Sequence, residues 1–260
     1  MTLPPLVNKV TTDFLAEVDH RLPDRLTGLF LHGSLCWGEF FPGSDIDFVA
    51  VWDQPPIGAD LDLLQAAHET IHAQHPDVVF DGFHCTSSDL AASPAHIDHR
   101  PDFYQSAFSS EGRIDINLVT WHELAERAIT VRGQLPPTHT DLPALLEFTR
   151  NNLDTFWRDA IKQIETSGIK PVGQHDPSIA MVTLGPARLH HLLTRHTLTS
   201  KSGAGRYVCD LDPKWNKIGR EALRLREQPN TPSLYDDPTQ RGQDAYDVLT
   251  WIVQNGTAPQ

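Results

Sequence analysis

Two carboxylates one residue apart, Asp45 and Asp47, lie at the start of an otherwise apolar run of the sequence. If this run is a β-strand, both side chains point to the same face, because successive side chains of a strand alternate. Two like charges this close raise each other's pKa unless a cation lies between them, and oxygen ligands suit Mg²⁺. A solvent-facing strand edge that carries two aspartates by chance is the alternative interpretation.

A Gly-Ser pair, Gly33-Ser34, precedes these acids and follows the apolar run Leu29-Phe30-Leu31. A turn at this point leaves backbone N–H groups uncovered by side chains, and Ser34 adds a hydroxyl donor, so the turn can receive phosphate oxygens. We therefore expect a phosphate-binding turn and two metal-binding carboxylates on neighbouring strands.

A third acid, Asp81, interrupts the apolar run of residues 77–85. An ionisable group in a buried strand is costly unless it is paired or binds a metal. Beside Asp45 and Asp47, this acid would complete a metal site and could accept the proton of an attacking hydroxyl. The alternative is a β-bulge at Gly82 that turns Asp81 to solvent.

Alternating helices and strands are expected to position these residues. The pattern predicts a helix over 7–22, a strand over 27–32, a loop over 37–43, a strand over 45–52, a helix from 61 to about 75 and a strand over 77–85. Residues 87–112 show no sustained period, so a loop or lid is expected there. A short strand over 115–119 and a helix over 121–128 follow. Thr120 is the expected N-cap of that helix, and Glu123 completes a capping box, which favours a structural role for Glu123.

A break rich in Gly and Pro at residues 132–138 ends the alternation, and only helical patterns follow it. We expect those helices over 142–164, 179–194, 215–226 and 244–253, with Pro186 kinking or splitting the second. The predicted fold is an α/β (α+β) domain with a mixed sheet over residues 1–137, followed by an all-α helical bundle domain over 138–260.

The composition narrows the class of protein. The chain has 260 residues, 39% of them hydrophobic, and a formal net charge of −13, which disfavours binding to a nucleic-acid backbone and favours a cationic substrate. No apolar run reaches the ~20 residues that span a membrane, and no secretion signal is visible, so we expect a cytoplasmic protein. Three scattered cysteines argue against a disulfide framework and against a CxxC zinc site, and surface positions explain His84, His96 and His99 better than a zinc site does.

Two cations stand out in the helical half. Arg188 lies among apolar residues of a predicted helix, and Lys201 is flanked by hydroxyl residues. An arginine in such a helix commonly snorkels or pairs with a carboxylate, whereas a lysine at a helix start can contact phosphate. Taken separately, each is expected to be structural.

The block Gly33-Ser34 followed by Asp45-Ile46-Asp47 resembles the signature of the polymerase-beta-like nucleotidyltransferase superfamily. The chain is similar, from about Leu26 to Trp251, to the streptomycin/spectinomycin-type aminoglycoside adenylyltransferases. LHGS, SDID, a strand acid followed by Asp89-Leu90, and then Arg188 and Lys201 occur in the order of that family.

The resemblance implies Mg²⁺-dependent transfer of AMP from ATP to a hydroxyl of a small cationic acceptor, an aminoglycoside or aminocyclitol antibiotic of the streptomycin or spectinomycin type. We expect a monomer that binds neither nucleic acid nor membrane. The resemblance assigns Gly33, Ser34, Ser44, Arg188 and Lys201 to ATP, Asp45, Asp47 and Asp81 to the metal, and Asp81 to the catalytic base. Phe103, Phe108 and Asp176 are candidate substrate contacts. The family usually has Glu where this chain has Asp81. A nucleotidyltransferase acting on a metabolite or a protein, and a non-catalytic nucleotide-binding module, are the alternatives.

Overall fold

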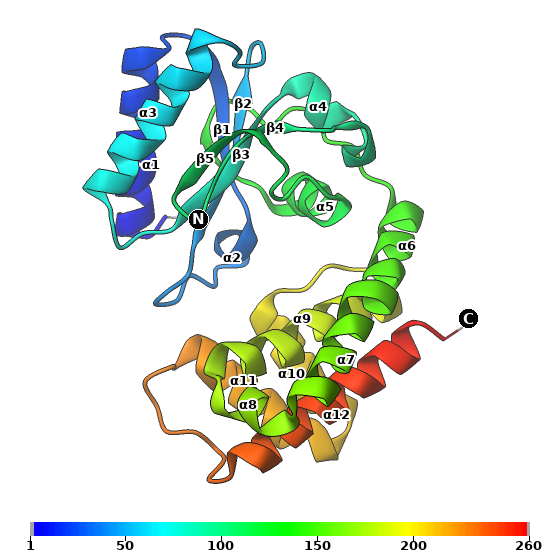
Figure 1. The fold of residues 1–260 in the computed structure, drawn as a ribbon. Coiled ribbons are helices and arrows are strands. Elements are labelled where there is room, and N and C mark those ends of the chain that lie inside the picture. The colour runs from blue at the N-terminus through cyan, green and yellow to red at the C-terminus, as the bar shows by residue number, and fades with distance from the viewer. Residues whose placement is uncertain (1–2, 259–260) are drawn as a thin grey trace. The chain divides into compact units, whose positions relative to one another are not determined.

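The structure is a computed structural model that describes residues 3–258 (Figure 1). The chain divides into two compact units, one ending at Asp141 and the other beginning at Leu142. The division lies a few residues beyond the break that the sequence indicated. Each unit has a hydrophobic core of its own.

The first unit is built on a mixed sheet, as the sequence predicted. Within the described residues the sheet has six strands in the order β5-β4-β3-β2-β1-β6. They are β1 Leu26–Leu31, β2 Ile46–Trp52, β3 Phe80–Thr86, β4 Arg100–Tyr104, β5 Ala107–Gly112 and β6 Ile129–Arg132. The pair β2 and β3 is parallel, whereas the other pairs are antiparallel.

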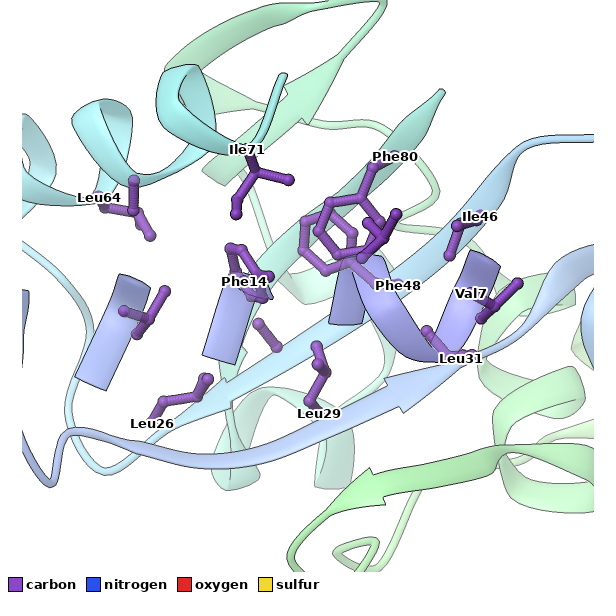
Figure 2. Packing of buried hydrophobic residues seen from close by; sticks show 14 of the residues in the cluster. Val7, Phe14, Leu26, Leu29, Leu31, Ile46, Phe48, Leu64, Ile71 and Phe80 are labelled. Atoms are coloured by element: carbon purple, nitrogen blue, oxygen red, sulfur yellow. The ribbon is translucent and has the colours of Figure 1, made fainter. Parts of the chain in front are cut away.

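Helices α1 (Pro5–Arg21) and α3 (Ala59–Gln74) cover one face of this sheet (Figure 1). Figure 2 shows Phe14 of α1 and Leu64 and Ile71 of α3 packed against the strand residues Phe48 and Phe80. The rings of Phe48 and Phe80 are 4.5 Å apart. Residues of β2 that alternate with the aspartates therefore point into this core, as the spacing predicted.

Helices α4 (Ser87–Ala91) and α5 (Leu118–Arg127) cover the opposite face. There Val49 and Phe83 of the sheet pack with Trp121 and Leu124 of α5, and the rings of Phe83 and Trp121 stack at 5.7 Å. Because side chains alternate along a strand, the residue two positions before Val49 and the residue two positions before Phe83 lie on this second face. Those residues are Asp47 and Asp81.

The prediction of a loop over residues 87–112 is wrong. The segment forms α4, a 3-10 helix at Pro94–His96 and the hairpin of β4 and β5. Strand β5 has no fully buried side chain, so it lacks the alternation that marks a strand. Its turn is made by Gln105 and Ser106 at φ 50° and 65°, a conformation that Asn and Gly usually signal.

The predicted strand over 115–119 and the predicted cap at Thr120 are also wrong. Asp115 has φ 56°, which breaks any strand, and Asn117 caps α5 by accepting hydrogen bonds from the N–H groups of Val119 and Thr120. Asparagine and threonine are both common N-caps, and here the earlier residue takes the position. Glu123 consequently belongs to no capping box.

His84 was expected at the surface, but the structure buries it completely in the core beneath α3. The Trp52 indole N–H donates to His84 Nδ1 at 3.0 Å, and His84 Nε2 lies 2.9 Å from His68 Nε2. Burial lowers the pKa of His68 to about 3 and the pKa of His84 well below its ordinary value. Both imidazoles are therefore neutral in the folded protein.

These buried histidines predict destabilisation by mild acid. Below the unfolded-state pKa of 6.5, the unfolded chain binds protons that the folded core does not, so the free energy of unfolding falls as pH drops. Each histidine contributes a slope of roughly 1.4 kcal/mol per pH unit. We expect the free energy of unfolding, measured with urea between pH 7 and 4.5, to fall less steeply with pH in His68→Phe than in wild type. In the exposed His96→Phe it should fall as steeply as in wild type. The same dependence of unfolding free energy on pH in all three proteins would show that the buried histidines do not cause the loss of stability in acid.

The second unit is helical throughout its described residues. Its elements are α6 Leu142–Asn152, a π-helical turn at Leu153–Trp157, α7 Arg158–Ser167, α8 Ile169–Gln174, α9 Asp176–Arg195, α10 Lys201–Leu211, a 3-10 helix at Pro213–Trp215, α11 Asn216–Glu227 and α12 Pro238–Gly256. The long helix predicted over 142–164 is interrupted by the π-helical turn. Pro186 lies inside α9 without splitting it. Among residues 3–258, no helix combines the length and the apolarity that crossing a membrane requires.

Candidate active site

Two of the three predicted acids face each other on adjacent strands. In the parallel pair of β2 and β3, Asp47 lies directly opposite Asp81. The register runs without interruption from Ile46 to Trp52, so no bulge at Gly82 turns Asp81 outward. Asp81 is only 6% exposed. Asp45 immediately precedes β2, so all three acids come from the same end of these two strands.

The site is short of positive charge for its carboxylates. Burial raises the pKa of Asp47 to about 7, and the charges of Asp45, Asp115 and Glu123 add to this rise, which the cation His32 opposes. Burial also raises the pKa of Asp81 to about 6, against a hydrogen bond from the Gln105 N–H to Asp81 Oδ1 at 3.2 Å. A cation bound beside these carboxylates would stabilise their ionised form.

The expected Gly-Ser turn is a four-residue helix, α2 (Gly33–Cys36), which follows β1 after the N-cap residue His32. Gly33 has φ +60°, and a Cβ at this position would lie 1.8 Å from Asp47 Oδ2. Only glycine allows this close approach of the backbone to the carboxylate. The Ser34 hydroxyl is buried and has no hydrogen-bond partner within the described residues, so it is available to a ligand.

One detail of the expected phosphate turn is wrong. The Gly33 N–H is not uncovered, because it donates to Glu123 Oε2 at 2.8 Å. His32 Nδ1 lies 3.4 Å from the same oxygen. Burial acts to lower the pKa of His32, but the hydrogen bond to Glu123 and the charges of Asp47 and Asp115 outweigh it and raise the pKa to about 9. His32 is therefore a buried cation among the acids.

His32, Asp115 and Glu123 are site residues that sequence reasoning missed. Glu123 lies 90 positions from Gly33 in the chain, so no local pattern connects the two residues. Asp115 comes from the loop before α5, where its left-handed backbone was not foreseen. A signal existed only for His32, which directly precedes the Gly-Ser pair.

Three other predicted site residues, Ser44, Phe103 and Phe108, contact partners within the protein. The Ser44 hydroxyl accepts the Phe41 N–H at 3.0 Å and so braces the loop before Asp45. Phe103 is 4% exposed and stacks on His68 at 4.6 Å, and Phe108 packs against the same core. Both phenylalanines belong to the sheet face beneath α3. Their role as substrate contacts stays a prediction.

The cations predicted in the second unit lie near each other. Arg188 Nε donates to the Thr199 carbonyl at 3.2 Å, which places Arg188 beside the start of α10, where Lys201 is the first residue. Asp176 begins α9 and pairs with Arg241 at 2.7 Å. Along α9, Asp176 and Arg188 are about 18 Å apart at 1.5 Å per residue, so they serve different places.

The first unit suits a magnesium ion that is bound partly by protein carboxylates and partly by the phosphates of the nucleotide. Among the described residues, no group of three or more His, Cys, Asp or Glu side chains is already gathered around a metal position. Mg²⁺ commonly binds through one or two carboxylates together with substrate phosphates. The carboxylates opposite each other on β2 and β3, with their raised pKa values, and the unpartnered Ser34 hydroxyl meet that requirement.

Comparisons with known proteins agree with this site. Residues 12–100 match the family model of a nucleotidyltransferase domain, and that span contains all three acids and the Gly-Ser pair. The chain matches no curated protein. Among solved structures, it is similar to spectinomycin adenyltransferase AAD(9) from Enterococcus faecialis with ATP and spectinomycin, at 12% identity and a TM-score of 0.64, over 93% of this chain and 98% of that chain. The similarity to this structure confirms the predicted fold, and the family model assigns a nucleotidyltransferase domain to residues 12–100.

Proposed function

We propose, from the premise that this chain is a transferase with a nucleotidyltransferase domain at residues 12–100, that it moves AMP from ATP to a hydroxyl of a small cationic acceptor. The observation that carries the proposal is the register of β2 and β3, which sets Asp47 opposite Asp81 on one face of the sheet. Gly33 lies against Asp47, and Ser34 is the next residue of the chain.

Asp45 and Asp47 would hold Mg²⁺, with Asp81 as a third ligand or as the base. When bound, the ion neutralises charge on the phosphates and aligns them for attack. The Ser34 hydroxyl donates to a phosphate oxygen, while Ser44 keeps the loop before Asp45 in place. Arg188 and Lys201 supply two neighbouring positive charges in the second unit, which suits contact with the ATP phosphates.

Asp81 is the proposed base. The acceptor oxygen forms a bond to the α-phosphorus, the bond from that phosphorus to pyrophosphate breaks, and the hydroxyl proton passes to the Asp81 carboxylate. The pKa of Asp81, raised to about 6 by burial, suits a group that is ionised near neutral pH yet basic enough to accept a proton. The Asp81 side chain is shorter than the glutamate that the family usually has, and the Gln105 N–H of the β4–β5 turn fixes it by donating a hydrogen bond to Oδ1.

The acceptor is proposed to be an aminoglycoside or aminocyclitol antibiotic of the streptomycin or spectinomycin type. A net charge of −13 and several acids at the site favour a cation. The similar solved structure is that of a spectinomycin adenyltransferase with ATP and spectinomycin. Asp176 would contact the acceptor, although Arg241 already pairs with it. The proposal includes antibiotic resistance as the role of a cytoplasmic monomer.

An acceptor panel tests this proposal. The protein is incubated with α-labelled ATP and Mg²⁺ and, separately, streptomycin, spectinomycin or a small-molecule and protein extract of cells. Label on one of the antibiotics, lost when EDTA is added, is the outcome we expect. Label only on an extract component would replace the antibiotic by a metabolite or a protein. Absence of both label and pyrophosphate release in every reaction would overturn enzymatic transfer.

A further inference from the structure

Glu123 of α5 joins the two ends of α2. Its Oε2 accepts the N–H of Gly33, the first residue of α2, at 2.8 Å, and its Oε1 accepts the indole N–H of Trp37, the C-cap residue, at 2.7 Å. The carboxylate is 4% exposed, so these bonds form away from water. One buried side chain therefore fixes both the start and the end of the segment that carries Ser34.

Arg127 holds the same segment from a second direction. It lies one helical turn after Glu123 on α5, and its guanidinium carbon lies 3.9 Å from the centre of the Trp37 ring. A cation over an indole face is attracted by the ring electrons. Trp37 is thus bonded at its edge and covered on its face by two residues of α5.

The position of Gly33 matters beyond α2 because its backbone touches a metal-binding acid. A Cβ on Gly33 would lie 1.8 Å from Asp47 Oδ2, so any shift of this residue changes the space left for the Asp47 carboxylate. The Ser34 hydroxyl, buried and without a partner in the described chain, is one residue further on. Holding Gly33 therefore holds both the proposed phosphate contact and the proposed metal ligand.

We propose that Glu123 is a positioning residue for nucleotide binding, which fixes the segment Gly33–Trp37 from α5 and thereby places Ser34 and Asp47. The inference rests on the proposed function, since it takes this segment as the phosphate contact. A buried carboxylate is expensive to desolvate and is tolerated where its oxygens are fully hydrogen-bonded. The two donors of α2 and the neighbouring His32 meet that need.

Glu123→Gln is the direct test, because glutamine has the same shape but only one acceptor oxygen. Its amide NH₂ must face either the Gly33 N–H or the Trp37 N–H. Two hydrogen-bond donors then point at each other, and one of the two bonds to α2 is lost. We expect the affinity for α,β-methylene-ATP with Mg²⁺, measured by titration calorimetry, to fall about tenfold or more. The exposed Glu126→Gln, on the same helix, should bind the analogue as wild type does.

A double-mutant cycle separates positioning from general destabilisation. Trp37→Phe removes the indole donor, so in that background the glutamine oxygen can turn to Gly33 without conflict. The loss caused by Glu123→Gln should then be several-fold smaller than in the wild-type background. Arg127→Ala, which removes only the cation over the indole, should weaken binding about two- to fivefold and serves if Glu123→Gln does not fold.

The outcomes distinguish the inference from the proposed function. Folded Glu123→Gln that binds the analogue as tightly as wild type does, or additive effects in the cycle, would overturn the positioning role and leave the proposed function standing. If Glu123→Gln does not fold, unchanged binding by Arg127→Ala would overturn it too. Wild type that fails to bind the analogue would contradict the proposed function itself, and the positioning role with it.

Discussion

Asp47→Asn is expected to lower AMP transfer by about 10²- to 10³-fold or more without unfolding the protein. The substitution keeps the size of the side chain but removes the charge opposite Asp81, on which metal binding would depend. Stability should not suffer. Burial raises the pKa of Asp47 from its ordinary value of 3.8 to about 7, so ionising Asp47 makes the folded state less stable as pH rises between those values. At pH 8 the variant should therefore unfold at the same temperature as wild type or higher.

Turnover with the best acceptor of the panel and thermal unfolding at pH 8 measure the two effects. Asp62→Asn is a matched control, because Asp62 is exposed on α3. This helix covers the face of the sheet opposite to Asp47 and Asp81. The control substitution should change neither quantity. Normal turnover by Asp47→Asn would remove Asp47 from the site, and a large fall in its unfolding temperature would contradict the stated cause of the raised pKa.

Gly33→Ala is expected to have the second-largest effect. The new methyl group would lie 1.8 Å from Asp47 Oδ2, so either α2 or the carboxylate must move, and the φ of +60° adds strain of about 1 kcal/mol. A displacement of about 1 Å near reacting groups can cost 10²-fold in rate. We expect losses of that order in turnover, together with weaker binding of ATP.

Gly58→Ala separates steric contact from backbone strain. Gly58 has φ +57°, close to that of Gly33, but a Cβ there meets nothing within 4 Å. Both variants add a Cβ at a positive φ and should lose stability to strain, while only Gly33→Ala places that Cβ against Asp47 and should lose activity. Equal activity of the two variants, measured as kcat/KM for ATP, would show that the contact between Gly33 and Asp47 is not important.

The sequence was sufficient where local signals determine structure. The apolar runs and turn residues predicted β1, β2 and β3, and the alternation of side chains put Asp47 and Asp81 opposite the residues that pack against α1 and α3. The hairpin of β4 and β5 gave no such signal, because β5 has no fully buried side chain and the turn uses Gln105 and Ser106. The four-residue strand β6 was not predicted, because it is short and its pairing with β1 joins residues about 100 positions apart in the chain.

Contacts between distant segments explain the remaining errors. Glu123 was interpreted from its spacing to Thr120, but its partners are Gly33 and Trp37, which only the folded chain brings near. The predicted surface position of His84 is wrong because the Trp52 indole and His68 give this histidine hydrogen bonds in the core. In each case the tertiary partner decides the role of the residue.

A crystal structure of the full chain with Mn²⁺ and α,β-methylene-ATP tests the proposed site most directly. Anomalous scattering locates the manganese independently of the coordinates. We predict an anomalous peak bound by Asp47, with Asp45 or Asp81 as a second ligand, and phosphate oxygens within hydrogen-bond distance of the Ser34 hydroxyl. A nucleotide bound with its phosphates away from Ser34, or manganese that does not touch Asp47, would contradict the assignment of this site to nucleotidyl transfer.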